Sequence, residues 1–193
     1  MSLELNGIGV SKGIAIGKAH ILQRHTLEAV EYCLPRYKIA DEVARFQRAV
    51  DTAKQQLRGV RKQIPADAPS DIAAFIDTHL LMMDDGALSS APINLIESQR
   101  INAEWALQMQ RDSLVRVFDE MDDPYLRTRK DDVDHVVNRI QRLLMNADHH
   151  EGETQEKRLK GRIIIADDLT PADTVLMQHQ GIAGFITEFG GPL

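Results

Sequence analysis

The stretch RIIIADDLTPADTVLMQHQGIAGFIT, residues 162–187, decides the fold of this chain. It opens with a short apolar run at residues 162–166 and closes with another at residues 182–187, and each has the length and composition of a strand. The residues between them read as one short helix. Because strands joined by a single crossover helix run parallel, we predict a βαβ unit.

The two ends of that helix carry local signals of their own. Thr170 suits the N-cap, Pro171 the first helical position, and Asp173 the third, where its carboxylate meets free backbone amides. Gly181 suits the residue that ends a helix. We therefore predict a helix that begins at Pro171 and ends before Gly181.

Parallel strands need further strands beside them, and the N-terminal segment offers one. Residues 14–22 alternate enough to be a strand, and Gly7, Gly9 and Gly13 form a turn before it. The glycine spacing does not match a nucleotide-binding loop, because these glycines precede a strand and do not open a helix. We expect this strand to join the C-terminal pair in one sheet.

Between these two ends the apolar residues recur at intervals of three and four, which is typical of amphipathic helices. Pro65 ends the first of these helices. Because such helices bury their apolar stripes against one another, residues 36–146 are predicted to form a helical bundle inserted into the α/β unit. The four helices are expected at residues 39–64, 70–83, 103–121 and 133–144.

Composition excludes several classes of protein. The formal net charge of −6 argues against a nucleic-acid partner, because neutralising phosphates needs concentrated Lys and Arg, and it leaves room for a basic protein partner. No apolar run approaches the roughly 18 residues of a membrane span, and the N-terminus lacks a signal-peptide pattern. Cys33 is the only cysteine, so we predict a cytoplasmic protein without an intrachain disulfide.

In an open parallel sheet, reactive groups gather beyond the carboxyl ends of the strands. Here those ends are residues 167–170 and 188–191, which we expect at the same edge of the sheet. Thr170 could cap its helix, or it could also offer its hydroxyl across to the second loop. The sequence by itself favours capping alone.

Several stretches resemble one known family. ADDLTPADT and GIAGFITEFGG, at the two strand ends, resemble the N-terminal domain of enzyme I, the phosphoenolpyruvate-protein phosphotransferase of the bacterial sugar phosphotransferase system. The opening GIGVSKGIAIGKA and the later DEMDDPYLRTRKDDV are similar to the same family. The L-T-P motif also occurs in phosphohistidine domains of dikinase-type enzymes. A phosphohistidine domain of a dikinase-type enzyme therefore stays open as an alternative, and so does a helical module that binds an unrelated partner. The helical insert favours enzyme I.

The resemblance implies a fold class and its domains. The fold is expected to be α+β or α/β, with an antiparallel helical bundle inserted into a phosphohistidine-type α/β subdomain that is incomplete here. The α/β subdomain is expected at residues 1–30 and 158–193, the helical HPr-binding subdomain at 36–146, and a linker at 147–157.

The resemblance also implies a phosphoryl relay. In the family, the paired glycines are followed by two variable residues and then Ser-His-Thr, and that histidine passes a phosphoryl group from phosphoenolpyruvate to the carrier HPr. Here Pro192 and Leu193 stand at the variable positions and the chain ends, so we expect a fragment that is inactive by itself. Thr170 is expected to position the histidine, and Gly190 and Gly191 to let backbone approach it.

The same resemblance assigns the remaining parts of the reaction. Phosphoenolpyruvate and Mg²⁺ are expected only through a C-terminal domain that this chain lacks, and no cofactor is expected in this chain. The parent enzyme is expected to be a homodimer that serves sugar uptake in the bacterial cytoplasm.

An HPr-like phosphocarrier is expected on the segment FIDTHLLMMDDGAL, where the family has an apolar patch ringed by carboxylates. Leu81 and Met82 fall just off the strongest apolar stripe of their helix, which fits a contact that faces solvent. They could instead pack inside the bundle, since apolar residues at helical spacing are usually core. Gly86 and Ala87 stand where the family has carboxylates, so a nitrogen-regulatory or fused paralogue with another carrier stays open. The candidate contacts are Asp77, Leu81, Met82, Asp84, Asp85 and Arg129.

None of the three histidines His79, His149 and His150 is predicted to have a chemical role. The spacing of His79 from Ile72 and Phe75 puts it on or beside the packed face of its helix, which favours a packed or hydrogen-bonded role over that of a nucleophile. His149 and His150 lie in a polar tract that is typical of a solvated linker, and it lacks the spacing of a metal site.

Overall fold

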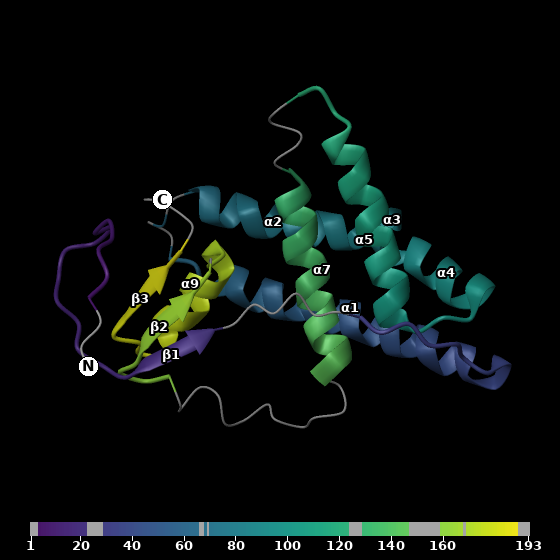
Figure 1. Cartoon of the computed structure of the whole chain (residues 1–193), viewed down its shortest axis with the longest axis horizontal. Coiled ribbons are helices and arrows are strands. Elements are labelled where there is room, and N and C mark those ends of the chain that lie inside the picture. Colours follow the sequence, from purple (N-terminus) through teal and green to yellow (C-terminus); the bar gives the residue numbers. More distant parts are fainter. Residues whose placement is uncertain are drawn as a thin grey trace. The chain divides into compact units, whose positions relative to one another are not determined.

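The chain divides into two compact units, which are described separately (Figure 1). The first combines residues 1–24 and 151–193 and holds the sheet, and the second is the helical unit of residues 25–150. No helix in the described part of the chain is both long and apolar enough to cross a bilayer. The computed structural model describes residues 4–22, 29–65, 68, 70–123, 129–146, 159–167 and 169–188.

The first unit is a three-stranded parallel sheet with one helix. Strand β2 (Ile163–Ala166) lies in the middle, between β1 (Ala19–Leu22) and β3 (Gly184–Thr187). Helix α9 (Pro171–His179) connects β2 to β3. The predicted βαβ unit, its parallel strands and the pairing with the N-terminal strand are therefore confirmed. A small apolar core holds the unit together and consists of Leu159, Ile164 and Met177, with Leu22, Leu169 and Ile182 packed against them.

The N-terminal strand is shorter than predicted. Residues 14–18 are not part of a strand, and Ile14 and Ile16 are 96% and 92% exposed. Strand β2 has only four residues, and all four already pair with Ala19–Leu22, so it offers no partner to the preceding segment. The alternation of apolar residues was therefore not sufficient evidence for a strand over residues 14–18.

The segment before β1 passes close to the turn that precedes β2. At Gly17 a Cβ would lie 2.4 Å from the carbonyl oxygen of Gly161, so this position requires glycine.

The second unit consists of helices, and the four predicted ones are confirmed (Figure 1). Helix α5 packs against α7, and α1 contacts both of them as well as α2. Most of the largest fully buried side chains of its core come from α1, α2, α5 and α7, including Phe46, Leu57, Ile76, Leu107 and Ile140. These helices are α1 (Ile39–Gln63), which follows the short 3-10 helix η1 (Arg36–Lys38), α2 (Ser70–Asp84), α5 (Ala103–Asp119) and α7 (Arg129–Asn146).

Two short helices between α2 and α5 were not predicted. They are α3 (Gly86–Ser89) and α4 (Ala91–Gln99), and α4 ends at Arg100 in the left-handed conformation with φ of 56°. Leu88, Pro92 and Ile96 are buried at intervals of four residues. That stripe is the signal that could have revealed them, although it is too short to stand out from a loop.

Arg45 on α1 joins three helices of this unit. Its Nε donates to Glu42 Oε2 at 3.0 Å, and its Nη2 donates to Glu104 Oε2 at 2.7 Å. Its Nη1 donates to the backbone carbonyl of Leu144 at 3.1 Å, near the end of α7. Both carboxylates are largely buried, so the guanidinium provides their charge compensation as well as a geometric link.

The two carboxylates extend this network to the start of α5. Glu42 Oε1 accepts a hydrogen bond from the backbone amide of Ala103 at 2.7 Å. The buried Asn102 side chain donates to Glu104 Oε2 at 3.0 Å and to the carbonyl of Val30 at 3.1 Å. The segment before η1 is thereby tied to the same group of polar side chains.

We expect Arg45→Met to lower the free energy of unfolding of the helical unit by about 3–5 kcal/mol, because it leaves two buried carboxylates without a cation. Trp105, the only tryptophan, lies on α5 and reports this unfolding by fluorescence in urea. The matched control is Arg61→Met, which breaks an exposed pair with Asp77 and should cost less than about 1 kcal/mol. Equal losses in the two variants would contradict the central role of Arg45.

Glu104 should also make the unit sensitive to acid. Burial by itself would raise the pKa of Glu104, but hydrogen bonds from Arg45 and Asn102 outweigh it and hold the pKa below its ordinary value of 4.5. The folded chain then binds fewer protons than the unfolded chain, so this stabilisation is present above about pH 4.5 and is lost as the pH falls further. The stability difference between the wild type and Glu104→Gln should shrink below that pH in urea titrations. A difference that stays constant down to about pH 3 would contradict the assignment.

Candidate functional site

Thr170 lies in the loop after β2 and caps α9. Its hydroxyl accepts a hydrogen bond from the backbone amide of Asp173 at 3.2 Å and donates to Asp173 Oδ2 at 2.7 Å. The same carboxylate oxygen accepts from the backbone amide of Thr170 at 3.1 Å, which completes a reciprocal capping box. The predicted helix start is confirmed, and the hydroxyl of the buried Thr170 already makes one donor and one acceptor contact inside its own turn.

The second loop of the predicted strand-end site, which follows β3, lies outside the described residues except for Glu188. Gly190 and Gly191 are outside the described residues, so the predicted proximity of Thr170 to Gly191 stays a prediction. The last described residue, Glu188, donates its backbone amide to the carbonyl of Ala166 at 3.2 Å. Strands β2 and β3 therefore stay paired up to the point where both loops begin, as the predicted site at one sheet edge requires.

The predicted docking segment lies on α2 and at the start of α3. Leu81 is 71% exposed, whereas Met82 is half-buried. The alternative that both residues pack in the bundle is thus wrong for Leu81. A large apolar side chain this exposed on an ordered helix is a candidate contact for another protein.

The carboxylates around Leu81 are already engaged. Asp77 Oδ1 accepts from Arg61 Nε at 3.1 Å, and Asp84 Oδ1 pairs with Lys54 Nζ at 2.7 Å. The hydrogen bond and charge of Lys54 lower the pKa of Asp84. Asp85 caps α3 by accepting the backbone amide of Ala87 at 2.8 Å.

The pairing of Lys54 and Arg61 of α1 with these carboxylates was not predicted from the sequence, although their spacing gave a signal. Lys54 and Arg61, with Arg58 between them, recur at intervals of four and three and so lie on one face of α1. This basic stripe pairs with the acidic residues of α2. The negative charge offered to a partner is consequently smaller than the acidic residues alone indicate.

Arg129, the other predicted contact, lies at the first position of α7. Its Nη1 donates to Asp132 Oδ2 at 2.8 Å, and its side chain is 39% exposed. Arg129 is therefore accessible to a partner and at the same time orients Asp132.

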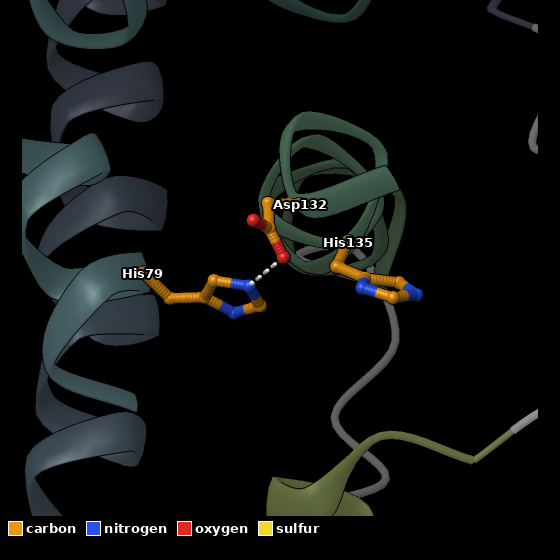
Figure 2. A group of neighbouring side chains, drawn as sticks. All are labelled: His79, Asp132 and His135. Carbon is orange, nitrogen blue, oxygen red and sulfur yellow. Dashed lines mark ion pairs between the residues drawn. The ribbon is translucent and has the colours of Figure 1, made fainter. Parts of the chain in front are cut away.

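His79 faces the interior of the helical unit and meets α7 there. Figure 2 shows its ring reaching from α2 toward α7, where Asp132 and His135 lie three residues apart on neighbouring turns. His79 Nε2 is 3.6 Å from Asp132 Oδ1, and its ring centroid is 4.0 Å from that of Phe75 and 6.0 Å from that of His135. Burial lowers the pKa of His79 to about 4 despite the nearby Asp132, so the imidazole is neutral at neutral pH.

The predicted burial of His79 is confirmed, since the residue is 3% exposed. The sequence did not predict its neighbours Asp132 and His135, which lie more than fifty positions away. Their spacing of three residues on one helix, which places them on one face, was the available signal.

The family model described as "PEP-utilising enzyme, N-terminal" matches residues 6–129. The chain belongs to this family. The match begins before β1 and ends at the first residue of α7, so it covers most of the helical unit, including α2 with Leu81.

Individual relatives of this PEP-utilising family match over almost the whole chain. A phosphoenolpyruvate-protein phosphotransferase of Cupriavidus necator is 37% identical over 201 residues, which cover 99% of this chain and 34% of that protein. One of Bacillus sp. (strain S) is 33% identical and covers 97% of this chain and 32% of that protein. The chain therefore spans about a third of the length of the curated relatives it matches.

A solved structure described as enzyme I (nEIt), determined by NMR, is similar with a TM-score of 0.71 and 27% identity, covering 94% of this chain and 72% of that chain. The resemblance to the N-terminal domain of enzyme I and the predicted fold class are both confirmed by these comparisons. The roles of individual residues in this PEP-utilising domain stay predictions.

We expect Thr170→Ala to lower the free energy of unfolding of the sheet unit by about 0.5–2 kcal/mol, because it removes the oxygen that caps α9. Thr170→Ser keeps that oxygen and should retain most of the stability. Hydrogen exchange of the β2 amides measures the effect in this unit.

The matched control is Thr174→Ala in the same helix, whose hydroxyl donates to the carbonyl of Pro171 and does not cap the helix start. That change should alter stability by less than about 0.5 kcal/mol. An equal or larger loss for Thr174→Ala would show that capping is not the main role of Thr170 in the fold.

Proposed function

We propose that this chain is the carrier-docking N-terminal part of a phosphoenolpyruvate-protein phosphotransferase. The whole protein would relay a phosphoryl group from phosphoenolpyruvate through a histidine to an HPr-like phosphocarrier in sugar uptake. Membership of the PEP-utilising family and the similarity to phosphoenolpyruvate-protein phosphotransferases of two bacteria support this proposal.

Transfer between two histidines needs a neutral imidazole, an in-line approach and groups that stabilise charge on the phosphoryl oxygens. Thr170 is proposed to orient that imidazole, and Gly190 and Gly191 to bring backbone close to it. The N-terminus of α9 at Pro171 adds a favourable dipole for the anion. The phosphoenolpyruvate and Mg²⁺ sites, and the contacts of a homodimer, are assigned to the rest of the protein.

The single observation that carries the docking role is the exposure of Leu81, which is 71%. Asp77, Leu81, Asp84 and Asp85 follow one another at intervals of four, three and one, so an apolar contact lies between carboxylates on one face of α2 and the turn after it. Such a patch suits a partner with an apolar centre and a basic rim. Met82, half-buried beside Leu81, and Arg129 on α7 are proposed to complete the surface.

Charge exchange is part of this proposal. Arg61 and Lys54 hold Asp77 and Asp84 in the free protein, and basic groups of the carrier would compete with them. The Arg61–Asp77 pair is exposed on both sides. In the other pair, Asp84 is 55% exposed although Lys54 is only 14% exposed. Exposed ion pairs are weak and screened by salt, so exchanging the partner of Asp77 costs little. Electrostatics would then mainly accelerate association, and Leu81 would supply most of the affinity.

The proposal predicts saturable binding of purified HPr to this chain, measured by isothermal titration calorimetry. Leu81→Ala should weaken the affinity about tenfold or more, because a central apolar contact is removed. Raising the salt concentration should slow association and weaken binding further. Val117→Ala on α5 is the matched control, since Val117 is also an exposed apolar residue at 51% and lies outside the proposed surface.

Two results would overturn the docking surface. One is binding of HPr that is insensitive to Leu81→Ala, and the other is no binding of HPr at all. The second result would favour the alternatives, which are a helical module for an unrelated partner and a phosphohistidine domain of a dikinase-type enzyme. A nitrogen-branch carrier tested in parallel distinguishes the sugar from the regulatory branch.

A further inference from the structure

We propose that His79, Asp132 and His135 form a binding site for a divalent transition-metal ion of the zinc type. One ligand atom from each of the three residues lies within 4.8 Å of the other two. The residues come from two helices, His79 from α2 and the other two from one face of α7 (Figure 2). Helix bundles commonly build metal sites in this way, with paired ligands on one helix and the rest on its neighbour.

His79 supplies the observation that points to a ligand. Its side chain is 4% exposed, and its Nε2 is buried without a hydrogen bond among the described residues. Asp132 Oδ1 lies 3.6 Å away, which is beyond hydrogen-bond distance. A buried polar atom without a partner is unfavourable, and a cation between this nitrogen and the carboxylate would satisfy both atoms.

The donor set selects the kind of ion. Two imidazoles and one carboxylate suit Zn²⁺ and chemically similar ions, with a fourth position open to water. Mg²⁺ prefers oxygen ligands in an octahedral arrangement, so these residues do not fit it. Histidine binds a metal ion as the neutral imidazole, so the three ligands would contribute one negative charge in total, which favours a cation.

Arg129 holds the carboxylate in a suitable orientation. Its Nη1 donates to Asp132 Oδ2 at 2.8 Å, while Oδ1 is directed toward His79. A hydrogen bond of this kind, from a residue that does not itself bind the ion, fixes the orientation of the carboxylate that does. Asp132 retains 16% side-chain exposure and His135 is half-buried, so an ion has a route in from solvent.

Metal binding would bring the ligand atoms of α2 and α7 closer together. Ligand atoms around tetrahedral Zn²⁺ lie roughly 3.3 Å apart, since each bond is about 2.0–2.1 Å. The present separations of up to 4.8 Å would therefore close by about 1.5 Å, which side-chain rotation can provide. The ion would act as a structural cross-link between the two helices, and this inference does not rest on the proposed function.

The test is a titration of the metal-free full chain with Zn²⁺ by calorimetry, and with Co²⁺ by visible absorption. We expect one equivalent per chain, a Co²⁺ spectrum typical of four-coordinate nitrogen and oxygen ligands, and a higher melting temperature with Zn²⁺. His79→Asn, His135→Asn and Asp132→Asn should each weaken binding at least tenfold. Circular dichroism shows whether each variant is folded.

Two controls separate this site from adventitious binding. His149→Ala with His150→Ala, and His20→Asn in β1, should leave the affinity unchanged. In ¹⁵N NMR spectra of the wild-type chain, Zn²⁺ should shift the His79 and His135 ring nitrogens, a readout that does not depend on any variant folding. Absence of binding, or binding lost only in the His149 and His150 variant, would overturn the site.

Discussion

The helical unit depends on one half-buried cation, Arg45. The guanidinium of Arg45 is the shared partner of Glu42, Glu104 and a backbone carbonyl near the end of α7, and Glu42 also accepts a hydrogen bond from the first backbone amide of α5. Apolar packing between α1, α5 and α7 tolerates some sliding, whereas a bidentate ion pair fixes distance and direction. The network therefore determines how α1, α5 and α7 are arranged, and that arrangement includes the face of α7 that meets α2.

Most of the fold could be predicted because its signals are local. The apolar periods of α1, α2, α5 and α7 and the capping box at Thr170 act within a few residues, so the sequence shows them directly. The strand at residues 14–18 failed for a nonlocal reason, since a strand needs a partner and β2 ends where its four residues are paired. The helices α3 and α4 escaped because nine or fewer residues give too few periods to recognise.

The site was predictable to a smaller extent. The exposure of Leu81 follows from its position off the apolar stripe of α2, which the sequence gives. The ion pairs of Asp77 with Arg61 and of Asp84 with Lys54 join different helices. The spacing of the basic residues shows a stripe on α1 but does not show which carboxylates it pairs with. The same holds for His79, whose burial could be predicted but whose contact with Asp132 depends on the crossing of α2 and α7.

Helix α2 carries its two candidate sites on opposite faces. Because an α-helix turns about 100° per residue, His79 and Leu81 are separated by about 200° around the axis. One residue therefore faces the bundle and the other faces solvent, as their exposures of 3% and 71% show. A partner at Leu81 cannot touch His79. An influence of one site on the other must therefore pass through the position of α2 or through Arg129, which contacts Asp132 and belongs to the proposed docking surface. The position of α2 is set on its inner side by contacts with α1 and α7. A cross-link at His79 would hold the docking face still and reduce the ordering cost of binding there, without adding a contact to the partner.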